Sequence, residues 1–555
     1  MIMRSTSYTR AAAAVVGLAL GALPLVVAPA LAKPSDAARR RAFNLFAAPI
    51  EIMQVNNIFC PVSNRGKVCV NQNDNPVLEG GFWPRGTPDS YIYNSGLMLG
   101  GVIANSPFAS AGFNGTADTI GVYFMDPRGS QFEGEGVTNV FNSANTSDQA
   151  SWPNGAIARD PTLFNAVLLG KKFISQQDVW VRVWDGNPAL TIGGSHPLGL
   201  LVDERGMAWN YPTGNEDIIY FIYTVYNVSA SNAAKYNNPT IDPALQSEIA
   251  AVGAQFKALN DQRYGISIPA DGYSISSAFL AFFEDCDVGN DSGHNYANAD
   301  FVFNLSFCWK SDFYEPTLTY PPGIFSSPLF VGIGFTGVKY LRSPLDNSVP
   351  PKELGLTLFS NTGNPTSSGG AGYIDPRGGK QLYRYLSGTS SPAAGDNSCT
   401  NQGQQLTLRY CFLFQTPVDA RFFMSSGPFT LPAGEARTIV VAYLQAAALG
   451  TEFTANCTPG PGENCQAGPP ANPAKIVSGP DSIRTIDKLT GWVGYSDTKA
   501  PIGTVTQDEV TTFPRTLLNK ALVAQSVFDN KFLLPFSPEQ PDFFLLPGDS
   551  SVTVV

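Results

Sequence analysis

The densest group of metal-ligating residue types in the chain is a short acidic segment. It runs from Glu284 to His294 and is followed by two more oxygen-bearing side chains. Aspartates alternate with other residues around Gly289, so a loop at this point could turn several oxygens toward one centre. Calcium takes six to eight oxygen ligands, and weak calcium sites are common outside the cell. The predicted ligands are Asp285, Asp287, Asn290, Asp291, Asn298 and Asp300.

Two other interpretations of this acidic segment remain open at this stage. The segment can be a solvated turn that Cys286 holds in place, or it can bind a transition metal through His294. Its spacing differs from that of an EF-hand, because no glutamate stands at the twelfth loop position. The chain has only two histidines, His196 and His294, which excludes a multi-histidine metal centre.

His196 is the second residue whose type could do chemistry. Ser195 precedes it, but adjacent residues rarely meet in the geometry of a Ser-His-Asp triad. Pro197 also occupies the last position of what would otherwise be a G-x-S-x-G elbow. We therefore expect a hydrogen-bonded structural histidine that lies before a strand.

Paired carboxylates are the third kind of chemistry to consider. A glycosidase needs two of them about 5–10 Å apart across a groove. The 45 acidic residues locate no such pair, so the catalytic residues stay unknown. Five tryptophans could stack on sugars, but in β-rich proteins such residues are more often core. They are Trp83, Trp180, Trp184, Trp209 and Trp309.

The eight cysteines form four couples that lie close together in sequence. In an exported chain, an even count of cysteines indicates disulfide bonds. Short polar stretches between the cysteines favour pairing within each couple. Each bridge is expected to restrain a surface loop and to contribute about 2–3 kcal/mol to stability. The predicted couples are Cys60 with Cys69, Cys286 with Cys308, Cys399 with Cys411, and Cys457 with Cys465.

Strands must position these groups. The runs Val179–Trp184 and Ile218–Tyr226 are dense in β-branched and aromatic residues. The second run is apolar nearly throughout, as in a central strand that is covered on both faces. Gly427–Leu431 and Thr438–Leu444 flank the turn residues Pro432–Glu435, and this pattern predicts a hairpin.

Two helices are also expected. Asp242 can cap the first one, Pro243 suits its first position, and apolar residues follow at helical spacing. These apolar residues are Leu245, Ile249, Val252, Phe256 and Leu259. The polar face of this helix lacks the Lys/Arg enrichment of a membrane-surface anchor, so we expect it to brace two β-regions. A second helix is predicted from Pro514 to Asp529.

The predicted fold class is mainly β, with two β-sandwich-like domains, a bracing helix between them and a short C-terminal helix. A charged fraction of 14%, 53 glycines and 43 prolines suit many short strands and turns. The predicted boundaries are a signal peptide at 1–32, an N-terminal β-rich domain at 33–235, a connecting helix at 236–262, a second β-rich domain with disulfide-clipped loops at 263–510, a helix at 511–534, and at 535–555 a linker with the start of a truncated fibronectin- or immunoglobulin-like domain.

The N-terminus and the charge predict where the chain works. Arg4 and Arg10 precede an apolar segment, and Ala30-Leu31-Ala32 is an A-x-A cleavage site, which together indicate a secretory signal peptide. No later segment approaches the ~20 apolar residues of a membrane span, so none is expected in the mature chain. A net charge of −10 provides no positive stripe for nucleic acid, which rejects that class of partner.

Several short sequence motifs occur together in this chain. They are Gly80–Gly86 with Tyr91–Gly100, His196–Gly199 with Trp209–Tyr211, Asp285–Asp291, and Ser426–Phe429 with Pro432–Gly434. Together they resemble a group of large, secreted, mostly uncharacterised bacterial surface proteins, whose β-rich N-terminal part is often followed by fibronectin type III-like repeats and a sorting domain. The resemblance implies an extracellular or outer-surface role without an established activity, and this chain departs from it by lacking complete repeats.

These observations predict an exported, non-catalytic structural or binding protein of the extracellular space or cell surface, with calcium as its expected ion. One alternative is a secreted carbohydrate-active or other hydrolase that uses an acidic site. Another is an accessory subunit of a surface appendage or secretion system. The expected partners are a surface polymer, a surface protein or a polysaccharide.

Overall fold

The computed structural model describes most of the chain between residues 50 and 446 and three later segments. The described residues are 50–69, 80–87, 89–113, 117–120, 126–127, 140–188, 196–289, 293, 295–310, 334–363, 376, 379–396, 410–412, 418–446, 517–534, 545–548 and 551–554. All of them belong to the compact unit Asn44–Val555. The predicted signal peptide lies outside the described residues.

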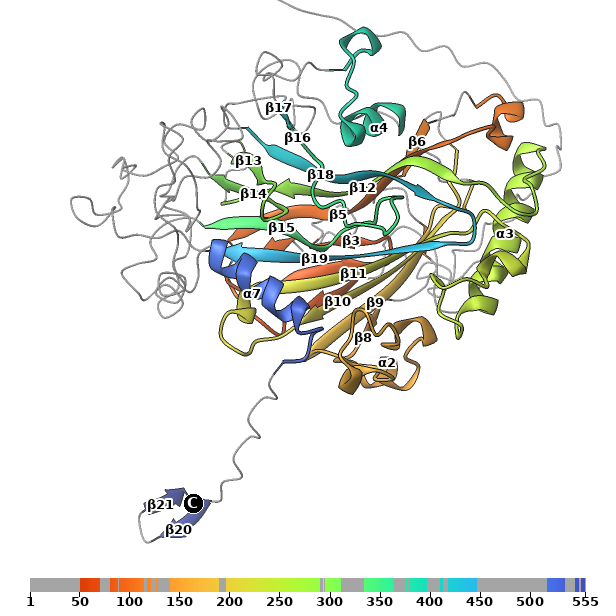
Figure 1. Cartoon of the computed structure of the whole chain (residues 1–555). Coiled ribbons are helices and arrows are strands. Elements are labelled where there is room, and N and C mark those ends of the chain that lie inside the picture. Colours follow the sequence, from red (N-terminus) through yellow and green to blue (C-terminus); the bar gives the residue numbers. More distant parts are fainter. Residues whose placement is uncertain are drawn as a thin grey trace, which may run out of the picture. The chain divides into compact units, whose positions relative to one another are not determined.

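Ten strands make up the first sheet (Figure 1). They are β1 (Ile50–Met53), β2 (Cys60–Ser63), β3 (Lys67–Val68), β4 (Gly81–Phe82), β5 (Ser90–Ile103), β6 (Ala117–Ile120), β12 (Ile275–Cys286), β16 (Leu358–Gly363), β17 (Tyr410–Phe412) and β18 (Ala420–Leu431). The spatial order is β1-β2-β3-β5-β12-β18-β16-β17, with β4 and β6 paired to β5. Only β16 and β17 pair in parallel within this described sheet.

Nine strands make up the second sheet, and all their described pairings are antiparallel. They are β7 (Asp126–Pro127), β8 (Phe141–Asn142), β9 (Gln177–Trp184), β10 (Leu200–Ala208), β11 (Ile218–Asn227), β13 (Asn295–Asp300), β14 (Leu305–Lys310), β15 (Phe335–Arg342) and β19 (Ala436–Ala446). The spatial order is β13-β14-β15-β19-β11-β10-β9-β7, with β8 paired to β9.

Helices are few in the part of the chain that the structure describes. The α-helices are α2 (Thr146–Ala150), α3 (Gln246–Tyr264), α4 (Gly379–Ser387) and α7 (Leu517–Asp529). Short 3-10 turns occupy η1 (Pro107–Ala111), η3 (Asn154–Ala156), η4 (Ala166–Leu168), η5 (Asn215–Asp217), η6 (Ala233–Tyr236) and η8 (Pro392–Ala394). None of the described helices combines the length and the apolar character that a membrane crossing needs.

The prediction of a mainly β fold is confirmed, and the two predicted β-regions contribute strands to both sheets. In the first sheet, β5 from the first region pairs with β12 from the second. In the second sheet, β11 pairs with β10 on one side and with β19 on the other. The predicted central strand is therefore confirmed in β11. Each sheet contains strands from both predicted regions, so neither sheet belongs to one region alone.

Tyrosines of the second sheet reach across to the first sheet and hold the two together. The hydroxyl oxygen of Tyr443 lies 2.7 Å from Oγ of Ser95 in β5. The hydroxyl of Tyr340 lies 3.1 Å from the carbonyl oxygen of Leu280 and 3.0 Å from that of Met424, which belong to two neighbouring strands of the first sheet. Each phenol buries a large apolar ring and still finds a polar partner for its hydroxyl group.

The predicted hairpin over Gly427–Leu431 and Thr438–Leu444 is wrong. Both segments are strands, as predicted, but β18 pairs with β12 and β16, whereas β19 pairs with β11 and β15. The turn at Pro432–Glu435 therefore carries the chain from the first sheet to the second. The same turn residues can connect two strands of a hairpin or two strands of different sheets. The strands that pair with β18 and β19 decide between these cases, and they lie far away in sequence.

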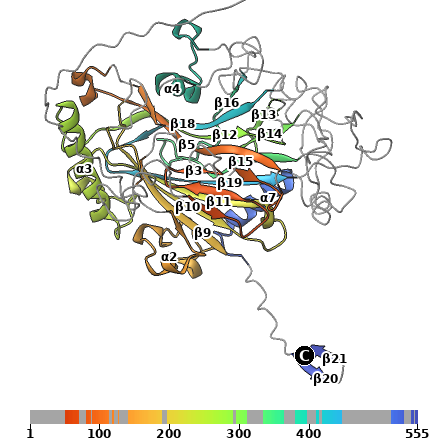
Figure 2. The ribbon, with the colours of Figure 1, turned by 180° about the vertical axis from the view of Figure 1, so that it is seen from behind.

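The bracing helix is confirmed as α3, with a later start than the sequence indicates. Asp242 accepts a hydrogen bond from the backbone amide of Ala244, 2.9 Å away, and so shapes a turn before the helix begins at Gln246. The predicted apolar face is buried at Ile249, Val252 and Phe256. Figures 1 and 2 show that α3 and α7 lie toward opposite ends of the strands.

The C-terminal helix α7 is held by a buried ion pair. Nζ of Lys520 lies 2.7 Å from Oδ2 of Asp217 and donates to the carbonyl oxygen of Gly214 at 2.9 Å. Both charged side chains have no exposed surface. Asp217 also accepts from the indole Nε1 of Trp83 at 2.9 Å, so one carboxylate links α7, η5 and the loop after β4.

Beyond α7, the predicted strand–turn–strand at the end of the chain is confirmed at the level of the backbone. Strands β20 (Leu545–Gly548) and β21 (Ser551–Val554) pair antiparallel, with Leu545 opposite Val554. Whether these strands open a fibronectin-like domain stays a prediction.

Removing the cation of the buried pair should loosen α7 strongly. We expect Lys520→Met to lower the free energy of unfolding by about 3–5 kcal/mol, because it leaves the carboxylate of Asp217 buried without its charge partner. Urea titrations followed by circular dichroism measure this change. Lys235→Met is the matched control, since Lys235 and Asp271 form an exposed pair at 3.8 Å and such pairs contribute at most about 1 kcal/mol. Equal losses in the two variants would contradict the prediction.

Candidate functional site

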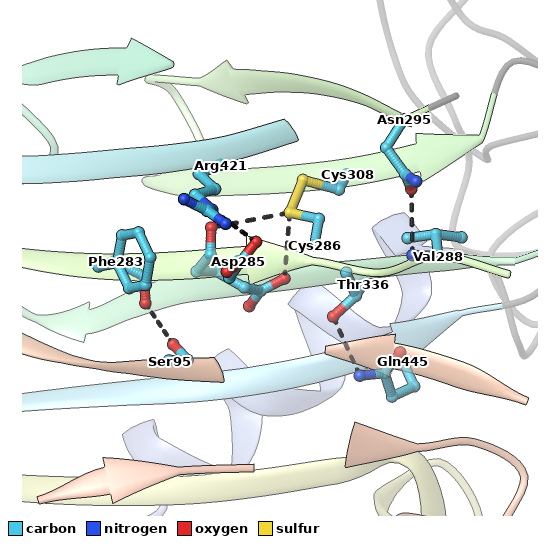
Figure 3. Close-up of a disulfide and its surroundings, with 11 residues drawn as sticks. Ser95, Phe283, Asp285, Cys286, Val288, Asn295, Cys308, Thr336, Arg421 and Gln445 are labelled. Carbon is cyan, nitrogen blue, oxygen red and sulfur yellow. Dashed lines mark hydrogen bonds and ion pairs between the residues drawn. A yellow bond between two sulfur atoms is a disulfide. The ribbon is translucent and has the colours of Figure 1, made fainter. Parts of the chain in front are cut away.

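A disulfide between the two sheets lies at the centre of the predicted acidic region. Cys286 ends β12 in the first sheet, and Cys308 lies in β14 of the second sheet, with a Cα–Cα distance of 6.3 Å. Neither side chain has exposed surface. Figure 3 shows the bond beside Asp285 and Arg421. The expectation that each bridge restrains a surface loop is therefore wrong for this pair, which joins two core strands.

The second described disulfide, between Cys60 and Cys69, closes the turn that connects β2 and β3. Two of the four predicted couples are thus confirmed. The remaining predictions, Cys399 with Cys411 and Cys457 with Cys465, involve side chains outside the described residues.

Three carboxylates converge next to the inter-sheet disulfide. Asp285 lies in β12, and Asp287 follows directly after the strand ends at Cys286. Asp419 stands just before β18, which pairs with β12 so that Arg421 lies opposite Asp285. One oxygen from each of the three carboxylates lies within 4.8 Å of the others. We call Asp285, Asp287 and Asp419 the carboxylate cluster.

Burial and mutual repulsion shape the electrostatics of the carboxylate cluster. Burial and, to a lesser degree, the nearby carboxylate of Asp419 together raise the pKa of Asp287 to about 7, against the opposing effect of the guanidinium of Arg421. The pKa of Asp285 is also raised by burial, although Nε of Arg421 lies only 2.8 Å from its Oδ1. Full ionisation of the cluster is therefore costly unless a proton or a cation neutralises it.

The other predicted calcium ligands have different positions. Asn298 and Asp300 lie in β13 of the second sheet, where their side-chain oxygens accept bonds from nearby backbone amides, that of Ala299 for Asn298 and those of Val302 and Phe303 for Asp300. Because β13 approaches the cluster through Asn295, which bridges to Val418, Asp300 lies roughly 17 Å farther along the strand at ~3.3 Å per residue.

Asn290 and Asp291 lie outside the described residues, as does His294. Sequence reasoning missed Asp419 because it lies far along the chain. The only local signal at this position is that Asp419 and Arg421 stand two residues apart in the sequence, and this spacing does not reveal the pairing of β18 with β12.

A second acidic group lies in the core between the sheets. Glu284 in β12 and Glu204 in β10 are both buried, with 0% and 1% exposure. Burial raises the pKa of each to about 8, so both hold a proton at neutral pH. Among the described residues, neither Oε1 of Glu204 nor Oε2 of Glu284 has a hydrogen-bond partner.

This second group cannot serve as an open catalytic pair or a thiolate metal site. Glu284 lies near Cys286 and Cys308, but disulfide-bonded sulfurs are not the thiolates that bind metals. A carboxyl group without exposed surface also cannot touch a dissolved substrate. Glu204 and Glu284 are therefore parts of the core, placed near the hydroxyl of Tyr443, whose pKa is raised by burial and, when they are ionised, by both carboxyl groups.

His196 is a structural residue, as expected from the sequence. Its ring is buried and stacks on Phe108 with the centroids 4.1 Å apart. Nδ1 lies 2.8 Å from the carbonyl oxygen of Pro197, and Nε2 lies 3.4 Å from Oγ of Ser106. Strand β10 begins shortly afterwards, at Leu200. Ser195 lies outside the described residues.

The five tryptophans considered for sugar stacking are core residues. Their exposed fractions are all 2% or less, so none presents a face to a dissolved ligand. Trp180, for example, packs in a small cluster with Trp152 and Ala156. Burial of such large side chains is a main source of stability in β-rich folds.

Comparisons with known proteins give this site no named counterpart. No protein-family profile matches the chain, and a search of curated proteins finds no significant match.

The acid in the core should make stability depend on pH. The pKa of Glu284 is about 8 in the folded chain against an ordinary value of 4.5, so between these values the folded state holds a proton that the unfolded state releases. Stability from this proton is complete below about pH 4.5 and is lost as the pH rises through about 8. Glutamine has no proton to lose. As the pH rises from about 5 to about 8, we therefore expect the free energy of unfolding of Glu284→Gln to increase by about 2–4 kcal/mol relative to that of the wild type.

Urea titrations at several pH values measure this difference. Glu353→Gln changes an exposed side chain and should follow the wild type at every pH. A Glu284→Gln variant whose stability runs parallel to that of the wild type would show that Glu284 does not titrate in this window.

Proposed function

We propose that this chain is an exported, non-catalytic structural or binding protein of the extracellular space or cell surface. The observation that carries the proposal is the fully buried Cys286–Cys308 bond between the two sheets. Disulfides form and persist in oxidising compartments outside the cytoplasm. A bond that joins core strands of two sheets matters for the fold itself, so the chain is suited to fold in such a compartment.

Two further observations support a structural or binding role over catalysis. The ring of His196 is enclosed by aromatic residues, and the carboxyl groups of Glu204 and Glu284 have almost no exposed surface. These three side chains are therefore used to fill and connect the core. The sequence pattern at Ala30-Leu31-Ala32 supports export.

We further propose that the carboxylate cluster binds calcium. Carboxylate oxygens are the ligands that calcium prefers, and a divalent ion would offset both the burial and the repulsion by Asp419 that raise the pKa of Asp287. Asp285, Asp287 and Asp419 would supply the protein ligands among the described residues. Because Asp287 and Asp419 flank β12 and β18, bound calcium would fasten the ends of two paired strands beside the disulfide.

Export predicts a defined product. When the whole chain is expressed in a bacterial host, we expect a secreted or surface-held protein whose N-terminus is Lys33, as Edman sequencing or mass spectrometry would determine. Peptide mapping without reduction should recover Cys286 linked to Cys308. A cytoplasmic product with an intact N-terminus, or alkylation of Cys286 and Cys308 as free thiols, would overturn the proposed function.

Calcium should stabilise the folded chain by mass action. At about 100 times the dissociation constant, a bound ion contributes about 2.7 kcal/mol, and thermal melts in calcium and in chelator measure the shift. Asp287→Ala should abolish the shift by removing a central ligand. Asp271→Ala is the control, because Asp271 is exposed and lies outside the carboxylate cluster. Magnesium should substitute poorly, since it requires a smaller octahedral shell.

One result would contradict the proposed calcium site. Identical melting curves in calcium and in chelator, together with no heat of binding in calorimetry, would leave the cluster without an ion, with Asp285 paired to Arg421.

A further inference from the structure

We propose that the outer face of the second sheet binds a neutral saccharide, in a cavity of about 510 Å³. Cavities of this size, roughly 300–1,000 Å³, hold small ligands. This inference rests on the proposed binding role and names the ligand class for it. We call this cavity the threonine cavity, after Thr224 and Thr438, which line it.

The strand register explains why hydroxyl groups face the threonine cavity. Thr224 in β11 lies opposite Asp203 in β10 on one side and opposite Thr438 in β19 on the other, so the three side chains form one polar row across the sheet. Oγ1 of Thr224 and Oγ1 of Thr438 are 3.1 Å apart. Thr224 is the only residue of β11 that is not fully buried, and Thr438 is also partly exposed. Asp203 is buried and pairs with Arg182, so the sheet is open to solvent at the two threonines.

Two ion pairs line the threonine cavity beside the polar row. Nη1 of Arg159 lies 3.2 Å from Oδ2 of Asp242. On another side, Nη1 of Arg342 lies 3.9 Å from Oδ2 of Asp160, and all four residues line the cavity. The four side chains are between 23% and 41% exposed, which leaves them accessible to a ligand.

The pairing of these charges points to a neutral ligand. Four arginines line the cavity, and each already faces a carboxylate, since Arg205 pairs with Asp178 and Arg437 with Glu435. An anionic ligand would therefore have to compete with a carboxylate for each guanidinium. A sugar hydroxyl both donates and accepts hydrogen bonds, and it can therefore bridge the donor and the acceptor of an Arg–Asp pair or join the hydroxyls of two threonines. Apolar side chains such as Ile222 and Leu345 also line the cavity and suit the C–H faces of a sugar ring.

Two assays with defined probes test this proposal. Affinity electrophoresis of the mature chain in gels cast with β-glucan, xylan or galactomannan reports binding to neutral polymers, and alginate serves as the anionic comparison. Titration calorimetry with millimolar maltose, cellobiose and N,N′-diacetylchitobiose reports binding to short saccharides. We expect retardation by at least one neutral polymer or heat with at least one disaccharide, and no dependence of that binding on salt.

Matched variants connect binding to the cavity. Thr224→Val and Thr438→Val each remove one hydroxyl and keep a β-branched shape that suits a strand, so the fold should persist in circular dichroism. Each should weaken saccharide binding about threefold to tenfold, the effect of one hydrogen bond. Thr430→Val should leave binding unchanged, because Thr430 bonds to Asn347 outside the cavity.

Three results would overturn the inference. These are no binding to any of the neutral probes, binding to alginate alone, and binding that both threonine variants leave at the wild-type level. The export experiment is independent of these assays. An exported chain that binds no neutral saccharide loses this inference alone, whereas a chain retained in the cytoplasm loses the proposed function even if a sugar binds.

Discussion

The space between the two sheets must satisfy polar groups as well as bury apolar ones, and the rest of the structure depends on how it does so. Phenol hydroxyls from the second sheet bond to a serine and to backbone carbonyls of the first sheet, as Tyr443 and Tyr340 show. A buried hydroxyl left without a partner costs roughly as much as a lost hydrogen bond. These contacts therefore favour one relative placement of the sheets over others that would bury the same apolar area.

The chemistry of the carboxyl groups follows from that placement. Neighbouring residues on β12 point to opposite faces, so Glu284 enters the core between the sheets while Asp285 turns toward Arg421. The first carboxyl group is kept neutral by burial. The second joins Asp287 and Asp419 at the strand end, where a cation can compensate them. The same short acidic segment thus supplies both a core residue and a candidate ion site.

Local sequence patterns predicted many of the strands and helices, but features that depend on the pairing of distant strands could not be predicted from the sequence. The strand at Ile218–Tyr226 and the helix face at Ile249, Val252 and Phe256 were readable because burial imposes a period on the sequence. The sheet-to-sheet crossing at Pro432–Glu435 and the arrival of Asp419 beside Asp287 were not readable. Both depend on which distant strands lie side by side, and this information is absent from any local stretch. The threonine cavity shows the same limit, since Thr224 and Thr438 meet only through the pairing of β11 with β19.

The position of β19 between β11 and β15 has a consequence for how the chain reaches its final form. Strands β9, β10 and β11 can pair early, but the free edge of β11 waits for a strand that ends only at Ala446. A bare strand edge is a template for aggregation, and topologies dominated by distant pairings fold slowly. A chain that emerges N-terminus first therefore passes through a long interval in which the second sheet is incomplete and the edge of β11 is unpaired. Until β19 pairs with it, the edge of β11 is open to pairing with another chain.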